Sequence, residues 1–317
     1  MIKKKKIIIT GSNGLLGQKL VHILKTRMEF EVIATSKGEN RIQDKSGYVY
    51  ETLDITDKKQ VEVLFRKHMP DTVINTAAMT NVDVCETDKE DCVALNISAV
   101  KNMVQTLEDL AKELNVKNAE TPHFIHLSTD FIFDGEHGPY KEEDEPNPLS
   151  YYGWSKLESE KAVKNSSLKW CILRTIIVYG TGDEMSRSNI VLWAKDALEK
   201  KQAIQVVDDQ FRSPTLAEDL AQACLLAVEK EATGIFHVSG KDIMSIIDIV
   251  NRVASYFHLD KSNVSTIKSS SLNQAAKRPP RTGFVLDKAR KELGYEPHTF
   301  EEGLEILNQQ LKQVKSK

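Results

Sequence analysis

A tyrosine and a lysine stand four residues apart in the run Tyr152-Gly-Trp-Ser-Lys156. On a helix this spacing places the phenol and the ammonium on one face. A phenol titrates near about 10, and a nearby cation lowers its pKa by favouring the ionised form. Tyr152 could then protonate a carbonyl oxygen while hydride reaches the carbonyl carbon, with Lys156 tuning the acid and reaching the cofactor ribose. The same spacing also occurs on ordinary surface helices.

A hydroxyl group precedes this pair at the end of an apolar run, in Leu127-Ser128-Thr129-Asp130. A hydroxyl at a strand end can donate a hydrogen bond to the oxyanion that develops in carbonyl chemistry. We expect Thr129 to do this, with Ser128 as the alternative. The competing interpretation is that these side chains only cap a turn.

Three glycines, Gly11, Gly14 and Gly17, lie between a β-branched run and an amphipathic segment. Glycines at such positions allow a tight turn, a close approach of the backbone to a pyrophosphate, and close packing of helix on strand. The following helix N-terminus offers free N–H groups to phosphates. We therefore expect a dinucleotide loop in which Asn13 and Leu15 also contact the cofactor.

The end of the second expected strand selects the cofactor. An acidic residue there would accept a hydrogen bond from the ribose 2′-hydroxyl of NAD, whereas a 2′-phosphate needs hydroxyls and cations. Ser36 and Lys37 occupy this place, and Arg41 follows. NADP(H) is therefore favoured, and NAD is the alternative. Further on, Asp54 with Ile55 could meet the adenine, or Asp54 could cap the helix that begins near residue 56.

The elements that must position these groups follow from the alternation of short apolar runs with helical patterns. Strands joined by helical crossovers are parallel and covered on both faces, so the pattern predicts an α/β fold with a doubly wound parallel sheet of the Rossmann type. The expected strands are 7–10, 31–35, 72–75, 123–128, 170–179, 204–207 and 235–238. The expected helices are 15–25, 58–68, 93–114, 151–164, 190–198, 216–228 and 243–257.

The division into domains is expected from the irregular segments that follow the first half of the chain. Residues 134–150 are rich in Pro, Gly and acidic side chains, which indicates a loop at the rim of the site. We expect a dinucleotide-binding domain over residues 1–175, joined by about 208–240. A smaller C-terminal substrate-binding lobe would then comprise 176–207 and 241–317.

Composition narrows the class of partner. The 317 residues carry a formal net charge of -3, which gives no field to draw nucleic acid or an anionic membrane. The four cysteines lack zinc-ligand spacing, so we expect no metal site. No apolar run reaches the roughly 20 residues of a membrane span. We expect a cytoplasmic protein that binds a small molecule, with a homodimer left open.

These residues together resemble the extended short-chain dehydrogenase/reductase family, and within it the dTDP-4-dehydrorhamnose reductase branch. The likeness covers nearly the whole chain. The stretches that carry it are GSNGLLG (11–17), PDTVINTAAMTNVDVCE (70–86), HLSTDFIFDG (126–135) leading to YYGWSK (151–156), and VVDDQFRSPT (206–215).

The resemblance implies NADP(H)-dependent reduction of the 4-keto group of a nucleotide-linked deoxysugar, with dTDP-4-dehydrorhamnose giving dTDP-rhamnose. It implies that Ala77 and Ala78 lie along the cofactor and that Thr129, Tyr152 and Lys156 form a catalytic triad. The residues expected to contact the sugar nucleotide are Thr80, Asp130, Phe131, Tyr152, Ile177, Asn189 and Arg212.

Two positions depart from the branch. Ile177 stands where these reductases commonly carry a tryptophan against the substrate, and Arg212 stands where a small residue is usual. Loss of an aromatic platform should change how a sugar packs. The departures leave the reductase fold intact and make the particular sugar the open question.

Three other functions compete. A sugar-nucleotide 4,6-dehydratase would be expected to carry a second acid after Asp130, where this chain has Phe131. A 4-epimerase would be expected to end its second strand with an acidic residue, and none is present. The third is a regulatory subunit similar to the β subunit of methionine adenosyltransferase, which also resembles this branch. The sequence leaves this function open, because an intact Tyr/Lys pair permits catalysis without requiring it.

Overall fold

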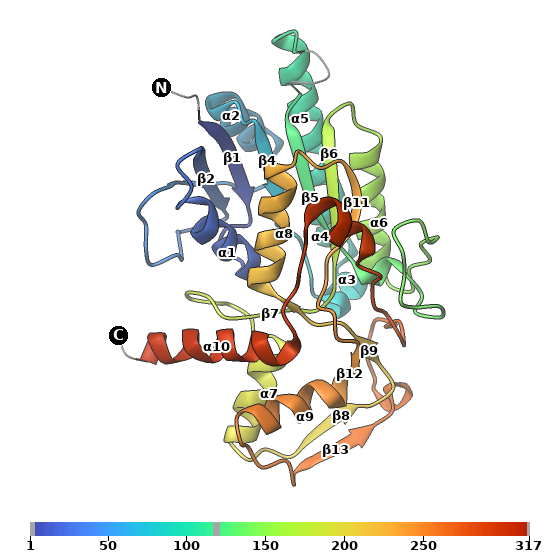
Figure 1. The fold of residues 1–317 in the computed structure, drawn as a ribbon. Coiled ribbons are helices and arrows are strands. Elements are labelled where there is room, and N and C mark those ends of the chain that lie inside the picture. Colours follow the sequence, from blue (N-terminus) through green and yellow to red (C-terminus); the bar gives the residue numbers. More distant parts are fainter. Residues whose placement is uncertain (1–3, 117–120, 316–317) are drawn as a thin grey trace.

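The central feature of the fold is a parallel sheet of seven strands in the order β11-β6-β5-β4-β1-β2-β3 (Figure 1). The structure is a computed structural model that describes residues 4–116 and 121–315. Each neighbouring pair in this sheet is parallel, which confirms the expected doubly wound fold. The strands are β1 (Lys5–Thr10), β2 (Phe30–Ser36), β3 (Val49–Thr52), β4 (Thr72–Asn75), β5 (His123–Thr129), β6 (Lys169–Thr175) and β11 (Gly234–His237).

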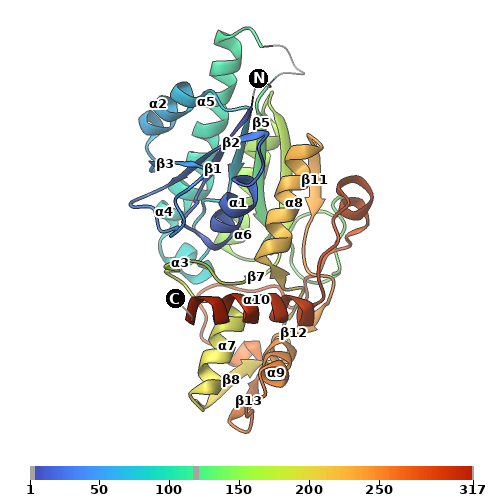
Figure 2. The same ribbon diagram turned by 60° about the vertical axis from the view of Figure 1, so that its left-hand side comes forward.

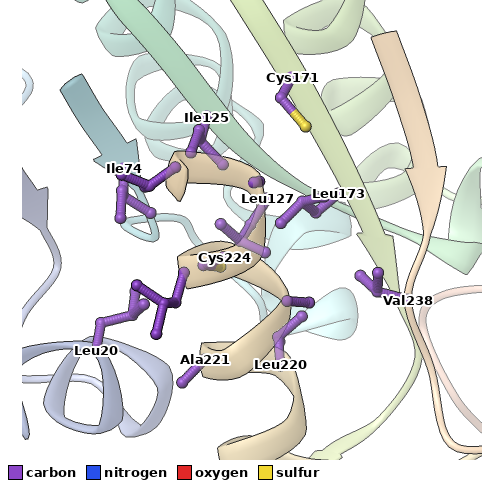
Figure 3. Close-up of a cluster of buried hydrophobic side chains, with 14 of the residues drawn as sticks. Leu20, Ile74, Ile125, Leu127, Cys171, Leu173, Leu220, Ala221, Cys224 and Val238 are labelled. Carbon is purple, nitrogen blue, oxygen red and sulfur yellow. The ribbon is translucent and has the colours of Figure 1, made fainter. Parts of the chain in front are cut away.

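Helices cover both faces of the sheet (Figures 1 and 2). One face carries α1 (Leu15–Leu24) and α8 (Ala217–Glu229), and the other carries α2 (Lys58–His68), α5 (Ala99–Glu113) and α6 (Tyr151–Lys164). Figure 3 shows Leu220 and Cys224 of α8 packed toward Ile125 and Leu173 of the sheet. All four are buried, so the removal of apolar surface from water holds this layer in place.

Two expected elements are interrupted. The strand expected over 170–179 ends at Thr175, because the backbone turns at Ile177 with a φ of 31°. The chain then leaves the main sheet, and β7 (Val178–Tyr179) pairs with β10 (Thr215–Leu216). The helix expected over 93–114 is a succession of α4 (Lys89–Val93), a π-helical turn η1 (Ala94–Ser98) and α5. Apolar periodicity alone does not show such a turn.

A smaller layer lies below the sheet in Figures 1 and 2. It has its own apolar core, in which α7, α9 and α10 contribute Val191, Ile249 and Leu304. The helix expected over 243–257 begins at Ile246, because Met244 and Ser245 pair with β9. The elements of this layer are α7 (Ile190–Glu199), β8 (Ile204–Val207), β9 (Phe211–Arg212), β12 (Met244–Ser245), α9 (Ile246–Tyr256), β13 (Val264–Ile267) and α10 (Phe300–Lys315).

The segment that joins this layer to α10 returns to the main core. Phe284, Leu286 and Leu293 pack in the same apolar cluster as β6 and α8, although the expected division places 241–317 in the substrate lobe. The expected division into a dinucleotide-binding domain and a substrate-binding lobe stays a prediction. The remaining short helices are α3 (Val82–Thr87), η3 (Asp130–Ile132), η4 (Ser269–Ser271) and η5 (Ala289–Leu293). Within residues 4–116 and 121–315, no helix is both long and apolar enough to cross a bilayer.

Candidate active site

The loop after β1 requires glycine at its first and third glycine positions. Gly11 has a φ of 71°, and a Cβ atom there would lie 2.9 Å from the backbone of Ala77. A Cβ atom on Gly17 would lie 2.3 Å from the Gly11 carbonyl oxygen. The loop thus brings backbone N–H groups and the N-terminus of α1, which begins at Leu15, to the carboxyl edge of the sheet. The buried hydroxyl of Ser12 has no protein partner and is free to bind a ligand. These features fit a dinucleotide.

Asn13 turns inward and ties this loop to the segment after β2. Its amide donates to the Glu39 carbonyl oxygen at 2.7 Å and accepts from the Arg41 amide at 3.0 Å. Ala77 and Ala78 follow β4, the neighbour of β1 on its other side. The glycine loop, the end of β2 and the end of β4 therefore meet where the strand order reverses, which is the place where open α/β sheets bind ligands.

The ends of β2 and β3 place one cation and one carboxylate together. The Lys37 Nζ atom lies 2.7 Å from Asp54 Oδ2, and 81% of the Lys37 side chain is exposed. Asp54 also accepts hydrogen bonds from Thr56, while Asp57 is the residue that caps α2. The contacts of Asp54 are therefore those of a turn and an ion pair. Ile55 is buried in an apolar cluster against which Ala77 packs, and its contact with a cofactor stays a prediction.

Helix α6 carries Tyr152 directly against the turn that follows β5. Ser150 caps the helix by accepting from the Gly153 amide at 3.1 Å. A Cβ atom on Gly153 would lie 2.1 Å from the Phe131 carbonyl oxygen, so only glycine permits this approach. As a result the Tyr152 ring packs edge-on against Phe131, with centroids 5.7 Å apart, and its hydroxyl lies near the Thr129 side chain.

Burial sets the protonation of the pair. It raises the pKa of Tyr152 well above the usual value, and the Thr129 side chain opposes the rise. The net shift is therefore opposite to the lowering expected from a nearby cation, because desolvation is the larger effect. Burial also lowers the pKa of Lys156 to about 8, although Glu160 and Cys92 favour its charged form. At neutral pH the site therefore holds a protonated phenol beside an ammonium.

The surroundings of Lys156 contain polar residues that the sequence patterns did not single out. The Lys156 Nζ atom lies 3.3 Å from His126 Nε2, and His126 also contacts Asn75 and Ser159. Asn75 and His126 are fully buried polar side chains inside apolar strands. A polar residue inside an apolar strand is the sequence signal that could have identified both, since buried polar groups need hydrogen-bond partners.

The residues expected to contact a sugar nucleotide divide into two groups. Thr80 is exposed and Phe131 and Ile177 are partly exposed, near the ends of β4, β5 and β6. The Thr80 hydroxyl accepts a hydrogen bond from Arg187 at 3.0 Å. Asn189 is engaged as the cap of α7, accepting from the Leu192 amide at 3.2 Å. Its side-chain amide also donates to the Gly180 carbonyl oxygen at 2.7 Å.

Asp130 and Arg212 depart from the expectation of substrate contact, because both are buried and satisfied by protein groups. The Thr282 hydroxyl donates to Asp130 Oδ2 at 2.5 Å, and the Arg212 Nε atom lies 3.7 Å from the same oxygen. Arg212 also donates to the Pro279 carbonyl oxygen at 2.7 Å and stands over the Phe131 ring. Arg212 and Asp130 together thus hold the segment 279–282, through the Pro279 carbonyl oxygen and the Thr282 hydroxyl.

The fold and the site together define an oxidoreductase of the short-chain dehydrogenase/reductase class. The dinucleotide loop, the strand order and the Thr129/Tyr152/Lys156 grouping are the features on which this rests. The chain belongs to the family described as RmlD substrate binding domain, which it matches over residues 5–313.

Two curated relatives are similar over most of the chain. The probable low-salt glycan biosynthesis reductase Agl14 of Haloferax volcanii is 32% identical over 94% of this chain and 96% of its own length. The methionine adenosyltransferase 2 subunit beta of Bos taurus is 30% identical over 88% of this chain and 79% of its own. An enzyme and a subunit of another enzyme are therefore both relatives.

Solved structures share the fold as a whole. A dTDP-4-dehydrorhamnose reductase from Clostridium acetobutylicum has a TM-score of 0.81 and 31% identity, covering 97% of this chain and 99% of its own. The dTDP-4-dehydrorhamnose reductase of Bacillus anthracis, solved in complex with NADP, has a TM-score of 0.83 and 27% identity, covering 97% of this chain and 100% of its own.

Proposed function

We propose that this protein is an NADP-dependent reductase of the 4-keto group of a nucleotide-linked deoxysugar, with dTDP-4-dehydrorhamnose as the substrate and dTDP-rhamnose as the product. The observation that carries the proposal is the placement of Tyr152 and Lys156 one turn apart on α6, with the Tyr152 ring packed on Phe131 directly after Thr129, at the sheet edge that holds the glycine loop. The names of the two reductase structures and of Agl14 support the same reaction class.

The residues act on the substrate carbonyl as follows. NADPH, when bound, supplies the hydride that reaches the carbonyl carbon. Tyr152 gives its phenolic proton to the carbonyl oxygen, so that the product is a neutral alcohol and the phenol becomes a phenolate. Thr129 lowers the cost of forming the phenolate, as its effect on the pKa of Tyr152 indicates, and the Lys156 ammonium stabilises the phenolate. The raised pKa of Tyr152 keeps the proton on the acid until the oxygen gains charge.

The test is NADPH oxidation by the purified protein in the presence of a dTDP-4-keto-6-deoxysugar. We expect turnover in the wild type and a loss of about 100-fold or more in Tyr152→Phe, as for other general acids. Tyr151→Phe is the matched control, because Tyr151 is the next residue of the same helix and lies partly exposed beside Trp154. It should keep full activity.

A cofactor-binding regulatory subunit is the second candidate, favoured by the 30% identity to the methionine adenosyltransferase 2 subunit beta. It predicts NADPH binding without turnover of any keto sugar, together with a tight complex with a second protein. That result would overturn the reductase proposal. Turnover that survives in Tyr152→Phe would overturn the assignment of the acid.

A further inference from the structure

Three polar side chains stand in register across the middle of the sheet. Thr10 of β1 is paired with Asn75 of β4, and Asn75 is paired with His126 of β5. The Thr10 hydroxyl donates to Asn75 Oδ1 at 2.6 Å, and Asn75 Nδ2 lies 3.1 Å from His126 Nδ1. All three are at most 1% exposed, so each depends on the others for its hydrogen bonds.

The row continues from the sheet into helix α6. His126 Nε2 lies 2.9 Å from the Ser159 hydroxyl oxygen, and Ser159 in turn donates to the Lys156 carbonyl oxygen at 2.7 Å. The same Nε2 atom lies 3.3 Å from Lys156 Nζ. A continuous buried chain therefore runs from Thr10, which directly precedes the glycine loop, to Lys156.

The direction of the donors fixes the tautomer of His126. Since Asn75 accepts from Thr10 through Oδ1, its Nδ2 donates to His126 Nδ1, which must carry the lone pair. The ring proton then resides on Nε2 and is donated to Ser159, whose own proton is used by the Lys156 carbonyl oxygen. With its lone pair engaged by Asn75, the ring cannot take a proton from the lysine.

Charge supports the same arrangement. Burial, and then Lys156, hold the pKa of His126 well below its usual range, so the imidazole stays neutral. The groups that bear on Lys156 itself are Glu160 on the same helix and Cys92 of α4, and both favour the ammonium. The neutral ring thus places no second positive charge beside the buried ammonium, which Glu160 and Cys92 stabilise instead.

We propose that His126 is a positioning residue for Lys156: a neutral imidazole, held as the Nε2–H tautomer by the row Thr10–Asn75, that acts through Ser159 to fix the turn of α6 that carries the lysine. The role rests on the proposed function, because Lys156 matters to catalysis only if the site reduces a carbonyl. It also ties the lysine to the strand that carries the glycine loop.

The first test does not depend on turnover. Nitrogen-15 NMR of the imidazoles, with the His126 signals assigned by their loss in His126→Gln, should give a neutral ring protonated at Nε2 throughout pH 5 to 8. A proton on Nδ1, or titration of the ring in this range, would overturn the proposal.

The second test compares variants of two buried histidines on the same strand. His126→Leu removes the ring, His126→Gln keeps an amide donor for Ser159, and His123→Leu removes a buried histidine that contacts the Ala232 carbonyl oxygen instead. For His126→Leu we expect kcat to fall about tenfold or more with KM nearly unchanged, as for other small misplacements of catalytic groups.

His126→Gln should restore most of kcat, and His123→Leu should keep both kcat and the wild-type pH profile. Equal effects of His126→Leu and His123→Leu would reduce the role of His126 to packing and overturn the proposal. If the wild type itself turns over no keto sugar, the proposed function fails instead, and the NMR result still decides the tautomer of His126.

Discussion

Helix α6 carries two buried charged side chains one turn apart, Lys156 and Glu160, and their polar neighbours differ. Glu160 receives two hydrogen bonds from Arg174 of β6, at 2.9 and 2.8 Å, and Lys164 lies 3.6 Å away. Lys156 is 3% exposed, and in the described part of the chain no carboxylate lies within 4 Å of its Nζ atom. The neutral ring of His126 lies 3.3 Å from this atom.

The difference separates a structural charge from one available for chemistry. Burial alone would raise the pKa of Glu160, but the hydrogen bonds from Arg174 hold it below the usual range. Burial lowers the pKa of Lys156 to about 8, since nothing beside it compensates fully. A paired buried ion is fixed in one state, whereas an unpaired one titrates near working pH, as catalytic groups do.

The largest expected effect is on stability, at the paired site. Arg174→Met should lower the free energy of unfolding by about 3–5 kcal/mol, because it leaves the Glu160 carboxylate buried and unpaired. Urea unfolding measures this. The control is the double variant Glu160→Leu with Arg174→Met, which should recover most of the loss. If Arg174→Met were as stable as the wild type, the difference drawn between Glu160 and Lys156 would be contradicted.

At the unpaired site, the expected effect is on turnover. Lys156→Met should lower kcat about 100-fold without lowering stability near neutral pH, since it removes an uncompensated buried cation. The pKa of Lys156 is about 8 in the folded protein against 10.5 for the free side chain. Between these values the unfolded chain binds more protons, so the stability of the wild type relative to Lys156→Met should rise with pH.

Urea unfolding of both proteins at about pH 7 and about pH 10 checks the sign. A wild type that loses stability relative to the variant over this window would mean that Lys156 is paired in the folded protein.

The smallest expected effect concerns an exposed ion pair. Lys37→Ala should leave unfolding unchanged, because exposed pairs contribute little to stability. It should weaken NADPH binding about three- to tenfold and leave NADH binding unchanged, if Lys37 serves the 2′-phosphate. Fluorescence titration with both cofactors measures this, and Lys45→Ala is an exposed control on the neighbouring loop. Tighter binding of NADH than NADPH in both proteins would contradict the cofactor assignment.

The parallel sheet followed from the sequence because buried parallel strands are short, continuous apolar runs. The apolar run Ile7–Ile9, with exposed loops around it, therefore predicted a strand. The end of the strand before Ile177 was harder to predict. The positive φ of this β-branched residue is imposed by the path of the chain toward its pairing with β10. The π-helical turn over Ala94–Ser98 was hidden for a similar reason: its extra residue is set by contacts with α6.

The candidate catalytic residues could be selected because they lie in short local patterns, such as Tyr152 and Lys156 one turn apart. Asp130 and Arg212 could not be assigned in this way. They are far apart in the chain, and only the folded protein brings them together with Thr282. The row Thr10, Asn75 and His126 was equally hidden, because it depends on the register of three strands rather than on any local spacing.

The apolar core of the lower layer has a consequence for the order in which the protein can be built. Its members come from α7, α9 and α10, so Phe300, Leu304 and Leu307 cover side chains that were synthesised about a hundred residues earlier. During translation that cluster stays open until the last helix has emerged. Val191, Ile249 and their neighbours then need protection from aggregation until residues 300–307 have been synthesised.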